Sequence, residues 1–484
     1  MIKMKKQLEA YLEKHLDEML QDVVRLCRID SVKGPEAGGM PYGPGPYAAL
    51  EEMREICRAY GFQTANYDNR VVTADFGGAE PCLDILAHMD VVAPGDGWTV
   101  TEAFEPRLSG DALYGRGTSD DKGPAVAALY AMRAVRDLGV PLGGRCRLIL
   151  GSDEESGSSD LPFYYRKEKE APMSFSPDAE FPVINIEKGQ FRGTISLSYG
   201  EAGGSGLLQG VSGNTINIVP QYAEADLSGV TETELMSAAE DVRRETGAVF
   251  TAEAEKTVDE SGREICRIRI TGKAAHASTP KEGVNAAILL LQLLSRLPES
   301  GSEWQQAVRK LASLFPYGDH KGAALGIARS DSLSGDTSVS LDILEIRDGK
   351  ICAKFDARTC VTADEANTAV PLKCRLEESG MEFSRSFVPP HAVDGQSSFV
   401  QTLLACYEEV TGKKGSCIAI GGGTYVHTLQ NGVAFGAVGA GTDTHMHGAD
   451  EFMPVRELLD AALIYALAIA RLCGAQEDSR SGER

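Results

Sequence analysis

The sequence contains little that would suit a membrane, an exported chain or a nucleic acid. Its longest late apolar run, Ala461–Ala470, has only ten residues, which is too short to cross a bilayer. The first 20 residues carry charges throughout and lack the apolar core of a signal peptide. Basic residues are scarce: 48 Lys and Arg stand against 70 Asp and Glu, and the formal charge of −22 repels phosphate backbones. We expect a protein that binds a small molecule and has no membrane or nucleic-acid partner.

Cysteine pairs at metal-binding or redox spacing are also missing. The 11 cysteines include no C-x-x-C, and their number is odd. They are scattered from Cys27 to Cys473, which is typical of thiols kept reduced inside a cell rather than of a disulfide framework. We therefore predict buried free thiols and a cytoplasmic location.

The sequence does contain a repeated order of strand and helix. With 484 residues the chain is too long for one ordinary core, so two or three domains are expected. Apolar, β-rich runs occur at Val71–Phe76, Cys82–Ala87 and Arg145–Leu150. They alternate with helical stretches at Lys5–Arg28, Pro46–Tyr60 and Gly123–Leu138. This order predicts an α/β fold with a mainly parallel sheet flanked by helices.

The pattern changes from about Gly189 to about Pro390. Segments such as EICRIRITG alternate polar and apolar residues like antiparallel strands with one wet face, and residues 338–359 form a predicted hairpin that turns at Asp348-Gly349. An apolar helix is predicted at Val284–Leu297, and strand-and-helix order returns after Pro390. We therefore predict a discontinuous catalytic domain, residues 1–186 and 385–484, interrupted by an inserted α+β lid domain, residues 187–384.

Five clusters of acids or histidines stand out, and four of them come just after predicted core strands. They are LAHMDVVAPGDGW with His88 and Asp90, GRGTSDDKGP with Asp120 and Asp121, LILGSDEESGS with Glu154 and Glu155, SPDAEFPV with Asp178, and TDTHMHGADEF with His445 and His447. Each alone has an ordinary explanation: a hydrogen-bonded pair, a helix N-cap, a solvated acidic face or a turn. In an open α/β sheet, however, ligands bind beyond the carboxyl ends of the strands. Together the clusters supply histidines and carboxylates suited to two divalent cations that share one bridging carboxylate.

These segments, in this order, resemble the co-catalytic zinc peptidase family that includes aminoacylase, glutamate carboxypeptidase and the bacterial dipeptidases. The family signature is H-x-D, then D-x-K-G, then E-E, then D, then H-x-x-D/E, and the match covers essentially the whole chain. The long insertion, with GRGTSDDKGP, GSDEESGS and SPDAEFPV, is most similar to the dipeptidase V branch.

The resemblance implies a role for each residue of the metal site. The implied metal ligands are His88 and Asp178 for one ion, Glu155 and His447 for the other, and Asp120 as the bridge. Asp90 would orient the imidazole of His88, and Glu154 would be the general base. Asp121 is left as a neighbour of the bridge, and His445 remains an alternative to His447.

The resemblance also implies substrate contacts from the inserted domain. His276 in GKAAHASTPKEGVNA would reach the oxygen of the tetrahedral intermediate, and Asn217 in GNTINIVP would lie at the substrate. Arg358 in FDART would bind the substrate carboxylate, and Gly421, Gly422 and Gly423 could let backbone N–H groups approach it. The alternatives are a helix-capping histidine for His276, a salt-bridged surface arginine for Arg358 and a plain tight turn for Gly421, Gly422 and Gly423.

The implied function is hydrolysis of dipeptides, including those that begin with β-alanine or contain a D-amino acid. The implied cofactors are two divalent ions, zinc first and manganese or cobalt as alternatives, because all three suit such ligands. By analogy with the large-insertion branch we expect a monomer. An N-acyl amino acid deacylase of the same family and a non-catalytic binding protein on this fold are the two rival functions.

Overall fold

The computed structural model describes residues 2–200, 206–259 and 262–475. The chain divides into two compact units. One comprises Met1–Ile186, Ala392–Ala419 and Gly423–Arg484, and the other comprises Glu187–His391 and Ile420–Gly422. We call them the catalytic unit and the insert unit. The insert unit extends beyond residue 384 because strand β21, Glu382–Val388, pairs with β10, Gly189–Ser198, in the sheet of that unit.

The catalytic unit is built on a nine-stranded sheet in the order β1-β2-β6-β3-β7-β24-β9-β22, with β23 paired to β9. The strands of this unit are β1 Gln63–Tyr67, β2 Val71–Gly77, β3 Pro81–His88, β4 Arg107–Ser109, β5 Ala112–Tyr114, β6 Arg145–Gly151, β7 Met173–Ser176, β8 Ala179–Glu180, β9 Val183–Glu187, β22 His391–Ala392, β23 Cys417–Ile420, β24 Gly432–Ala434, β25 Ala437–Val438 and β26 Phe452–Pro454. The neighbouring strands β6, β3, β7 and β24 run parallel, whereas β1, β2 and β6 pair antiparallel. The fold-class prediction is confirmed, and the parallel part of this mixed sheet is its centre.

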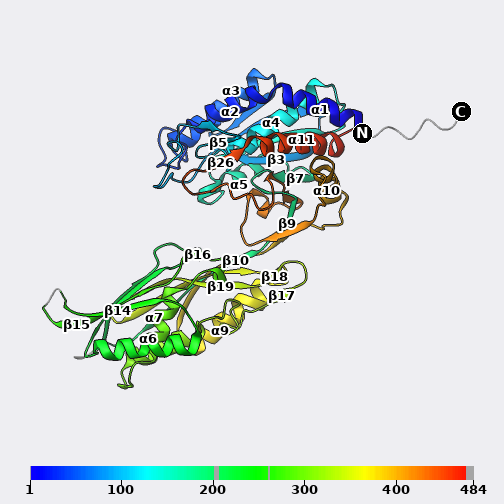
Figure 1. Cartoon of the computed structure of the whole chain (residues 1–484). Helices are drawn as coiled ribbons and strands as arrows, with labels where there is room; N and C mark the ends of the chain where they lie inside the picture. Colours follow the sequence, from blue (N-terminus) through cyan, green and yellow to red (C-terminus); the bar gives the residue numbers. More distant parts are fainter. Residues whose placement is uncertain (1, 201–205, 260–261, 476–484) are drawn as a thin grey trace. The chain divides into compact units, whose positions relative to one another are not determined.

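Helices cover both faces of this sheet. They are α1 Ile2–Lys14, α2 Leu16–Cys27, α3 Pro44–Ala59, α4 Lys122–Asp137, α5 Asp160–Tyr165, α10 Ser398–Thr411 and α11 Val455–Leu472, with short helices η1 Glu154–Ser156 and η4 Tyr425–Thr428. The main core joins one face of the sheet to α1–α4, α10 and α11, and Figure 1 shows red α11 beside cyan α4. A smaller core on the other face packs α5 and η4 against residues such as Leu86 and Ile149.

The predicted amino-terminal helix is interrupted. One helix was expected over Lys5–Arg28, but α1 ends at Lys14 and α2 begins at Leu16. Between them the Nδ1 atom of His15 lies 2.7 Å from the carbonyl oxygen of Tyr11, and the backbone of His15 leaves the helical region. A side chain that bonds to the preceding turn competes with regular helix, which explains the break.

The insert unit has an eight-stranded antiparallel sheet in the order β14-β15-β13-β11-β19-β20-β10-β21. Its elements are β10 and β21, already given, with β11 Gly206–Ser212, β12 Ile218–Val219, β13 Tyr222–Ser228, β14 Thr251–Val258, β15 Glu264–Thr271, β16 Ala275–His276, β17 Ser330–Asp331, β18 Gly335–Asp336, β19 Ser338–Arg347, β20 Lys350–Thr359, α6 Glu232–Thr246, α7 Ala286–Ser295, α8 Glu303–Leu314, α9 Val370–Glu378, η2 Pro280–Glu282 and η3 Glu365–Ala369. A separate apolar core packs its helices on one face of the sheet. The predicted hairpin is present: Asp348 and Gly349 both have positive φ, as a two-residue type I′ turn requires.

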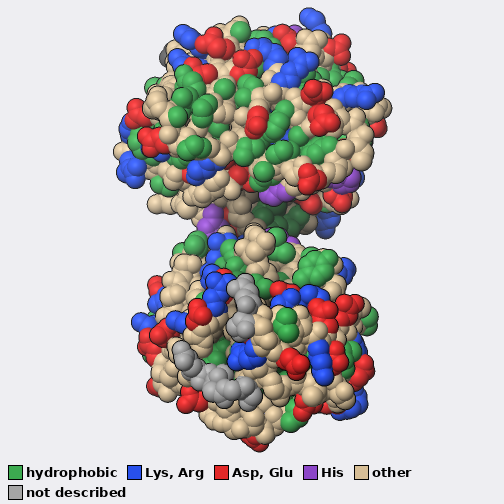
Figure 2. Space-filling view, turned by 90° about the vertical axis from the view of Figure 1, so that its left-hand side faces the viewer, with side chains coloured by type: hydrophobic (Ala, Val, Ile, Leu, Met, Phe, Trp, Pro, Cys, Tyr) green, Lys and Arg blue, Asp and Glu red, His purple; other side chains and the backbone are tan. Residues whose placement is uncertain are grey.

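All 11 cysteines are unpaired, as predicted, but the expected burial holds for only seven of them: Cys82 and Cys352 are partly exposed, and Cys374 and Cys417 are exposed. Within the described residues, no helix combines the length and apolar character needed to span a bilayer. On the face drawn in Figure 2, Lys and Arg side chains are interspersed with Asp and Glu rather than gathered in one basic patch.

Candidate active site

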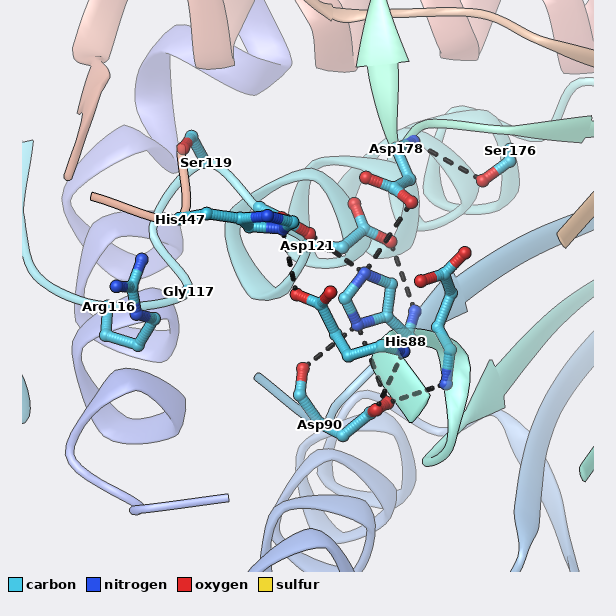
Figure 3. Close-up of polar contacts among 12 residues, drawn as sticks. His88, Asp90, Arg116, Gly117, Ser119, Asp121, Ser176, Asp178 and His447 are labelled. Carbon is cyan, nitrogen blue, oxygen red and sulfur yellow. Dashed lines mark hydrogen bonds and ion pairs between the residues drawn. The ribbon is translucent and has the colours of Figure 1, made fainter. Parts of the chain in front are cut away.

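The carboxyl ends of the central parallel strands bring the predicted metal residues together. His88 ends β3, Glu154 and Glu155 begin η1 just after β6, and Asp178 follows β7. Asp120 comes from the loop before α4, and His447 from the loop before β26. Figure 3 shows Asp178, Asp121 and His447 around the ring of His88. Residues from five separate segments thus form one cluster, as open α/β sheets favour at this edge.

Asp120 lies between the two histidines of the cluster. Its Oδ1 atom is 2.9 Å from Nε2 of His88, and its Oδ2 atom is 2.9 Å from Nε2 of His447. Asp178 Oδ2 is 3.6 Å from the same nitrogen of His88, and Glu155 Oε1 is 3.3 Å from that of His447. Each carboxylate oxygen of Asp120 therefore faces a different histidine.

The ring of His88 is oriented as a metal ligand would be. Its Nδ1 atom lies 2.9 Å from the backbone carbonyl oxygen of Asp90, and because a carbonyl only accepts, Nδ1 donates. The fully buried Nε2 atom makes no hydrogen bond within the described residues. Its lone pair faces carboxylate oxygens, which is unfavourable unless a cation lies between them. The oxygen and nitrogen donors of this cluster therefore fit divalent metal ions.

Asp90 holds the ring of His88 through its backbone. The backbone carbonyl, rather than the carboxylate, bonds to His88, and the Asp90 carboxylate oxygen Oδ1 lies 3.6 Å from Nδ1. The carboxylate instead accepts the backbone N–H groups of Glu154, at 3.2 Å, and Glu155, at 3.1 Å. Asp90 thus fixes both the histidine ring and the turn that carries the two glutamates.

Without a bound cation, the buried carboxylates of the cluster repel one another. Burial raises the pKa of Glu154 well above its usual range, and the negative charge of Asp178 raises it further. Burial would also raise the pKa of Asp120, but the imidazoles of His447 and His88 beside it hold that pKa below its usual range. The bond that His447 donates to Asp120, and secondly its bond to Glu155, raise the pKa of His447 to about 11. Bound divalent cations would replace the protons on the histidines and on Glu154 as the positive charge among the acids.

The loop that carries His447 has an unusual backbone. His445, His447 and Asp450 have positive φ values of 55°, 62° and 55°, which residues other than glycine seldom adopt. Such conformations persist where surrounding structure imposes them, often at functional sites. His445 packs its ring against Phe452, so the structure brings His447, and not His445, to the cluster.

The insert unit brings His276 next to Asn217. Strand β12 pairs with β16, and Ala277 donates its backbone N–H to the carbonyl oxygen of Asn217 at 2.8 Å. Nδ1 of His276 lies 2.6 Å from Oγ of Ser278 and accepts the backbone N–H of Ser278 at 3.1 Å. Because Nδ1 accepts, the ring proton of neutral His276 lies on Nε2, where it can donate to an oxygen of a ligand.

Arg358 already makes hydrogen bonds within the insert unit. Its Nε and Nη2 atoms donate to the carboxylate of Asp356, and Nη1 donates to the carbonyl oxygen of Gly421 at 2.6 Å. These bonds use three of the five guanidinium N–H groups and leave one on each Nη atom. A Cβ on Gly421 would lie 2.7 Å from Cβ of Ser278, so this glycine permits a close approach, whereas one on Gly422 would make an ordinary contact. Gly423 belongs to the catalytic unit.

Asp342 supports Asn217 and gives the insert unit a pH-dependent stability. Its Oδ2 atom accepts the backbone N–H of Asn217, whose φ is +77°. Burial raises the pKa of Asp342 from 3.8 to about 7, and the nearby Asp356 adds to the rise. The folded chain therefore keeps a proton that the unfolded chain releases, and this stabilisation is complete below pH 3.8 and lost as pH rises through about 7.

We expect Asp342→Asn to flatten this pH dependence. Between pH 4 and pH 7 the native protein should lose up to about 1.4 kcal/mol of unfolding free energy per pH unit from this group. Urea unfolding at several pH values, compared between native protein and variant, measures the difference in slope. Equal slopes would show that Asp342 is ionised in the folded protein.

Some residues at these sites escaped sequence interpretation. Arg116 and Glu451 belong to two of the motifs and are both buried. Charged residues in loops are usually solvated, so nothing in the sequence indicated that these two would be buried by the tertiary fold. Tyr425 donates its hydroxyl to Asp160 at 2.6 Å and packs its ring edge-on to His88. Only its proximity to the glycines at 421–423 could have drawn attention to it.

The chain belongs to a known class of metallopeptidases. Residues 85–471 match Peptidase family M20/M25/M40, which confirms the family resemblance drawn from the motifs. Among its relatives, "Putative dipeptidase YtjP" of Bacillus subtilis (strain 168) is 34% identical over 464 residues, which cover 94% of this chain and 97% of that protein. "Beta-Ala-Xaa dipeptidase" of Lactobacillus delbrueckii subsp. lactis is 32% identical over 469 residues, or 95% and 97% of the two chains.

Solved structures share the fold at low sequence identity. Human carnosine dipeptidase 1 has a TM-score of 0.56 and 15% identity, and the match covers 97% of this chain and 99% of that one. Aminoacylhistidine dipeptidase from Vibrio alginolyticus has a TM-score of 0.58 and 13% identity, with 95% and 97% covered. At these identities the likeness establishes the fold alone.

Proposed function

We propose that this protein hydrolyses the peptide bond of dipeptides with two divalent metal ions and a glutamate general base. The observation that carries the proposal is the position of Asp120, whose two carboxylate oxygens each lie 2.9 Å from a different histidine. A carboxylate placed in this way suits a bridge between two cations. The names of the two relatives, a dipeptidase and a β-Ala-Xaa dipeptidase, support the substrate class.

Each metal ion has its own set of ligands in this proposal. His88 and Asp178 hold one ion, Glu155 and His447 hold the other, and Asp120 binds both. The metal pair, when bound, polarises the scissile carbonyl and makes the attacking water more acidic. We propose zinc, with manganese and cobalt as alternatives that the same donors accept.

Glu154 moves the proton in this reaction. One oxygen of its carboxylate lies within 4.8 Å of ligand atoms of His88 and Asp178. It would take a proton from the attacking water and deliver it to the amine that leaves. Asp90 keeps Glu154 in place through the backbone N–H bond at 3.2 Å.

The insert unit would bind the reacting carbonyl oxygen and the carboxylate end of the substrate. Nε2–H of His276 would donate to the oxygen that becomes negative in the transition state. The two remaining N–H groups of Arg358 would bind the substrate carboxylate, and Asn217 and the glycines at 421–423 would lie beside it. A carboxylate site of this kind limits the substrate to one residue beyond the scissile bond.

A hydrolysis panel tests the substrate class. Metal-depleted protein, reconstituted with zinc, manganese or cobalt, should hydrolyse free L,L-, β-alanyl or D-containing dipeptides with a kcat/KM at least about 100-fold above that for N-acetyl amino acids, a difference of about 2.7 kcal/mol. The reason is that only a free dipeptide carries a charged amino group, which the acidic side chains of the cluster attract. A preference for N-acetyl amino acids would make the protein a deacylase, and no hydrolysis of either class would refute the proposal.

We further propose that the protein is cytoplasmic and monomeric. The location is supported by 11 unpaired cysteines, which suit a reducing compartment.

A further inference from the structure

A fully buried glutamate follows the last metal residue of the catalytic unit. Glu451 lies four residues after His447, and its side chain is 0% exposed. Its carboxylate accepts hydrogen bonds that all come from the loop before α4. The donors are Nη1 of Arg116 at 2.5 Å, the backbone N–H of Gly117 at 3.1 Å, the backbone N–H and Oγ of Ser119 at 3.0 and 3.1 Å, and the backbone N–H of Asp120 at 3.2 Å.

Arg116 completes the link from the other side. It is 1% exposed, and its Nη2 atom donates to the carbonyl oxygen of Gly448 at 3.0 Å, one residue after His447. The backbone joins the same two loops, because Gly115 donates its N–H to the carbonyl oxygen of Glu451 at 2.9 Å. Figure 3 shows Arg116, Gly117 and Ser119 on the side of the cluster where His447 lies.

Stability alone does not account for this pair. Removing two charges from water costs several kcal/mol per ion, and a well-packed apolar pair of similar volume is often as stable. What apolar side chains could not do is accept bonds from successive N–H groups of one loop and so fix the direction of the Asp120 backbone. The pair joins the two loops that carry the bridging carboxylate and the exposed histidine, and the positive φ of His447 shows that its loop needs such a restraint.

We propose that Glu451 and Arg116 form a clamp that positions Asp120 and His447, and so sets the affinity for the ion that these two residues share with Glu155. Glu451 is a positioning residue and not a ligand, because donors from the loop occupy both of its oxygens. The proposal rests on the metal site proposed above.

The test is Glu451→Gln, with Asp84→Asn as its matched control. Asp84 is also a buried acid, and it accepts hydrogen bonds from Nε and Nη2 of the buried Arg147 at 2.6 and 2.7 Å. Unlike Glu451, it is not bonded, among the described residues, to the loops that carry Asp120 and His447. Both variants lose a charged partner of an arginine and should lose thermal stability. Only Glu451→Gln should bind the second Mn²⁺ about 10–100-fold more weakly in calorimetric titration of metal-free protein.

Electron paramagnetic resonance supplies a second readout that a purely structural role would not change. Native protein with two Mn²⁺ should give the spectrum of a coupled pair, whereas Glu451→Gln at equal metal loading should give isolated Mn²⁺. If Glu451→Gln fails to fold, Arg116→Lys, which keeps the charge but cannot reach both loops, should show the same loss to a smaller degree. Native affinity for both ions in the variant that folds would overturn the clamp. Native protein that binds fewer than two ions would instead refute the proposed metal site.

Discussion

Glu154→Gln should lower kcat by about 10²–10⁴-fold while the protein still binds two metal ions. Glutamine has nearly the same shape as glutamate but cannot accept a proton from water. The backbone bond to Asp90 does not involve the side chain, so the turn that carries residue 154 should keep its position. Steady-state kinetics and metal analysis of the same sample measure the two effects together.

Glu155, the next residue, provides the control for this prediction. Glu155→Gln should weaken metal binding, because Oε1 of Glu155 lies 3.3 Å from the ring of His447 in the cluster. Two neighbouring glutamates would then differ in which quantity they change. If Glu154→Gln retains full kcat, or loses activity only by losing metal, Glu154 is not the base.

Asp120→Asn should abolish the paired metal site. The bridging role requires an ionised carboxylate with two equivalent oxygens, and the amide nitrogen of asparagine cannot ligate a metal ion. We expect at least about 100-fold weaker binding of both ions and a matching loss of activity. Calorimetric titration of metal-free protein with Mn²⁺ or Zn²⁺ gives the affinities.

Asp121→Asn is the control for the bridge. Asp121 is buried beside Asp120, but its Oδ2 atom accepts the backbone N–H of His88, and the carbonyl oxygen of asparagine can do the same. This variant should therefore keep both ions. If Asp121→Asn loses them and Asp120→Asn does not, the bridge has been assigned to the wrong residue.

Local sequence pattern predicts most of the fold that positions this site. The apolar runs now seen as β3 and β6 were long enough to mark central strands, and the Asp-Gly pair at residues 348–349 marked a hairpin turn. The break at His15 was not predictable, since it depends on one side chain bonding to the turn before it. The extension of the insert unit past residue 384 depends on the pairing of β21 with β10, a contact between distant strands.

The candidate site, like the fold, could be predicted only in part from the sequence. The ordered motifs were enough to name the clustered residues. Three of the motifs follow β3, β6 and β7, whose carboxyl ends meet at one edge of the sheet, whereas Asp120 and His447 come from loops and were named through the family resemblance. The partners of those residues were not predictable. Asp90 uses its backbone carbonyl toward His88, Arg358 bonds to Asp356, and Glu451 is buried under the loop of Asp120. Each of these facts depends on which way a side chain turns after folding, and sequence spacing does not encode that direction.

The most direct test of the central claim is to locate the metal ions in crystals of the protein grown with Mn²⁺. Anomalous diffraction should give two peaks about 3.5–4 Å apart, with one oxygen of Asp120 at each peak. His88 and Asp178 should surround one peak, and Glu155 and His447 the other. A single peak, or two peaks that do not share Asp120, would contradict the account.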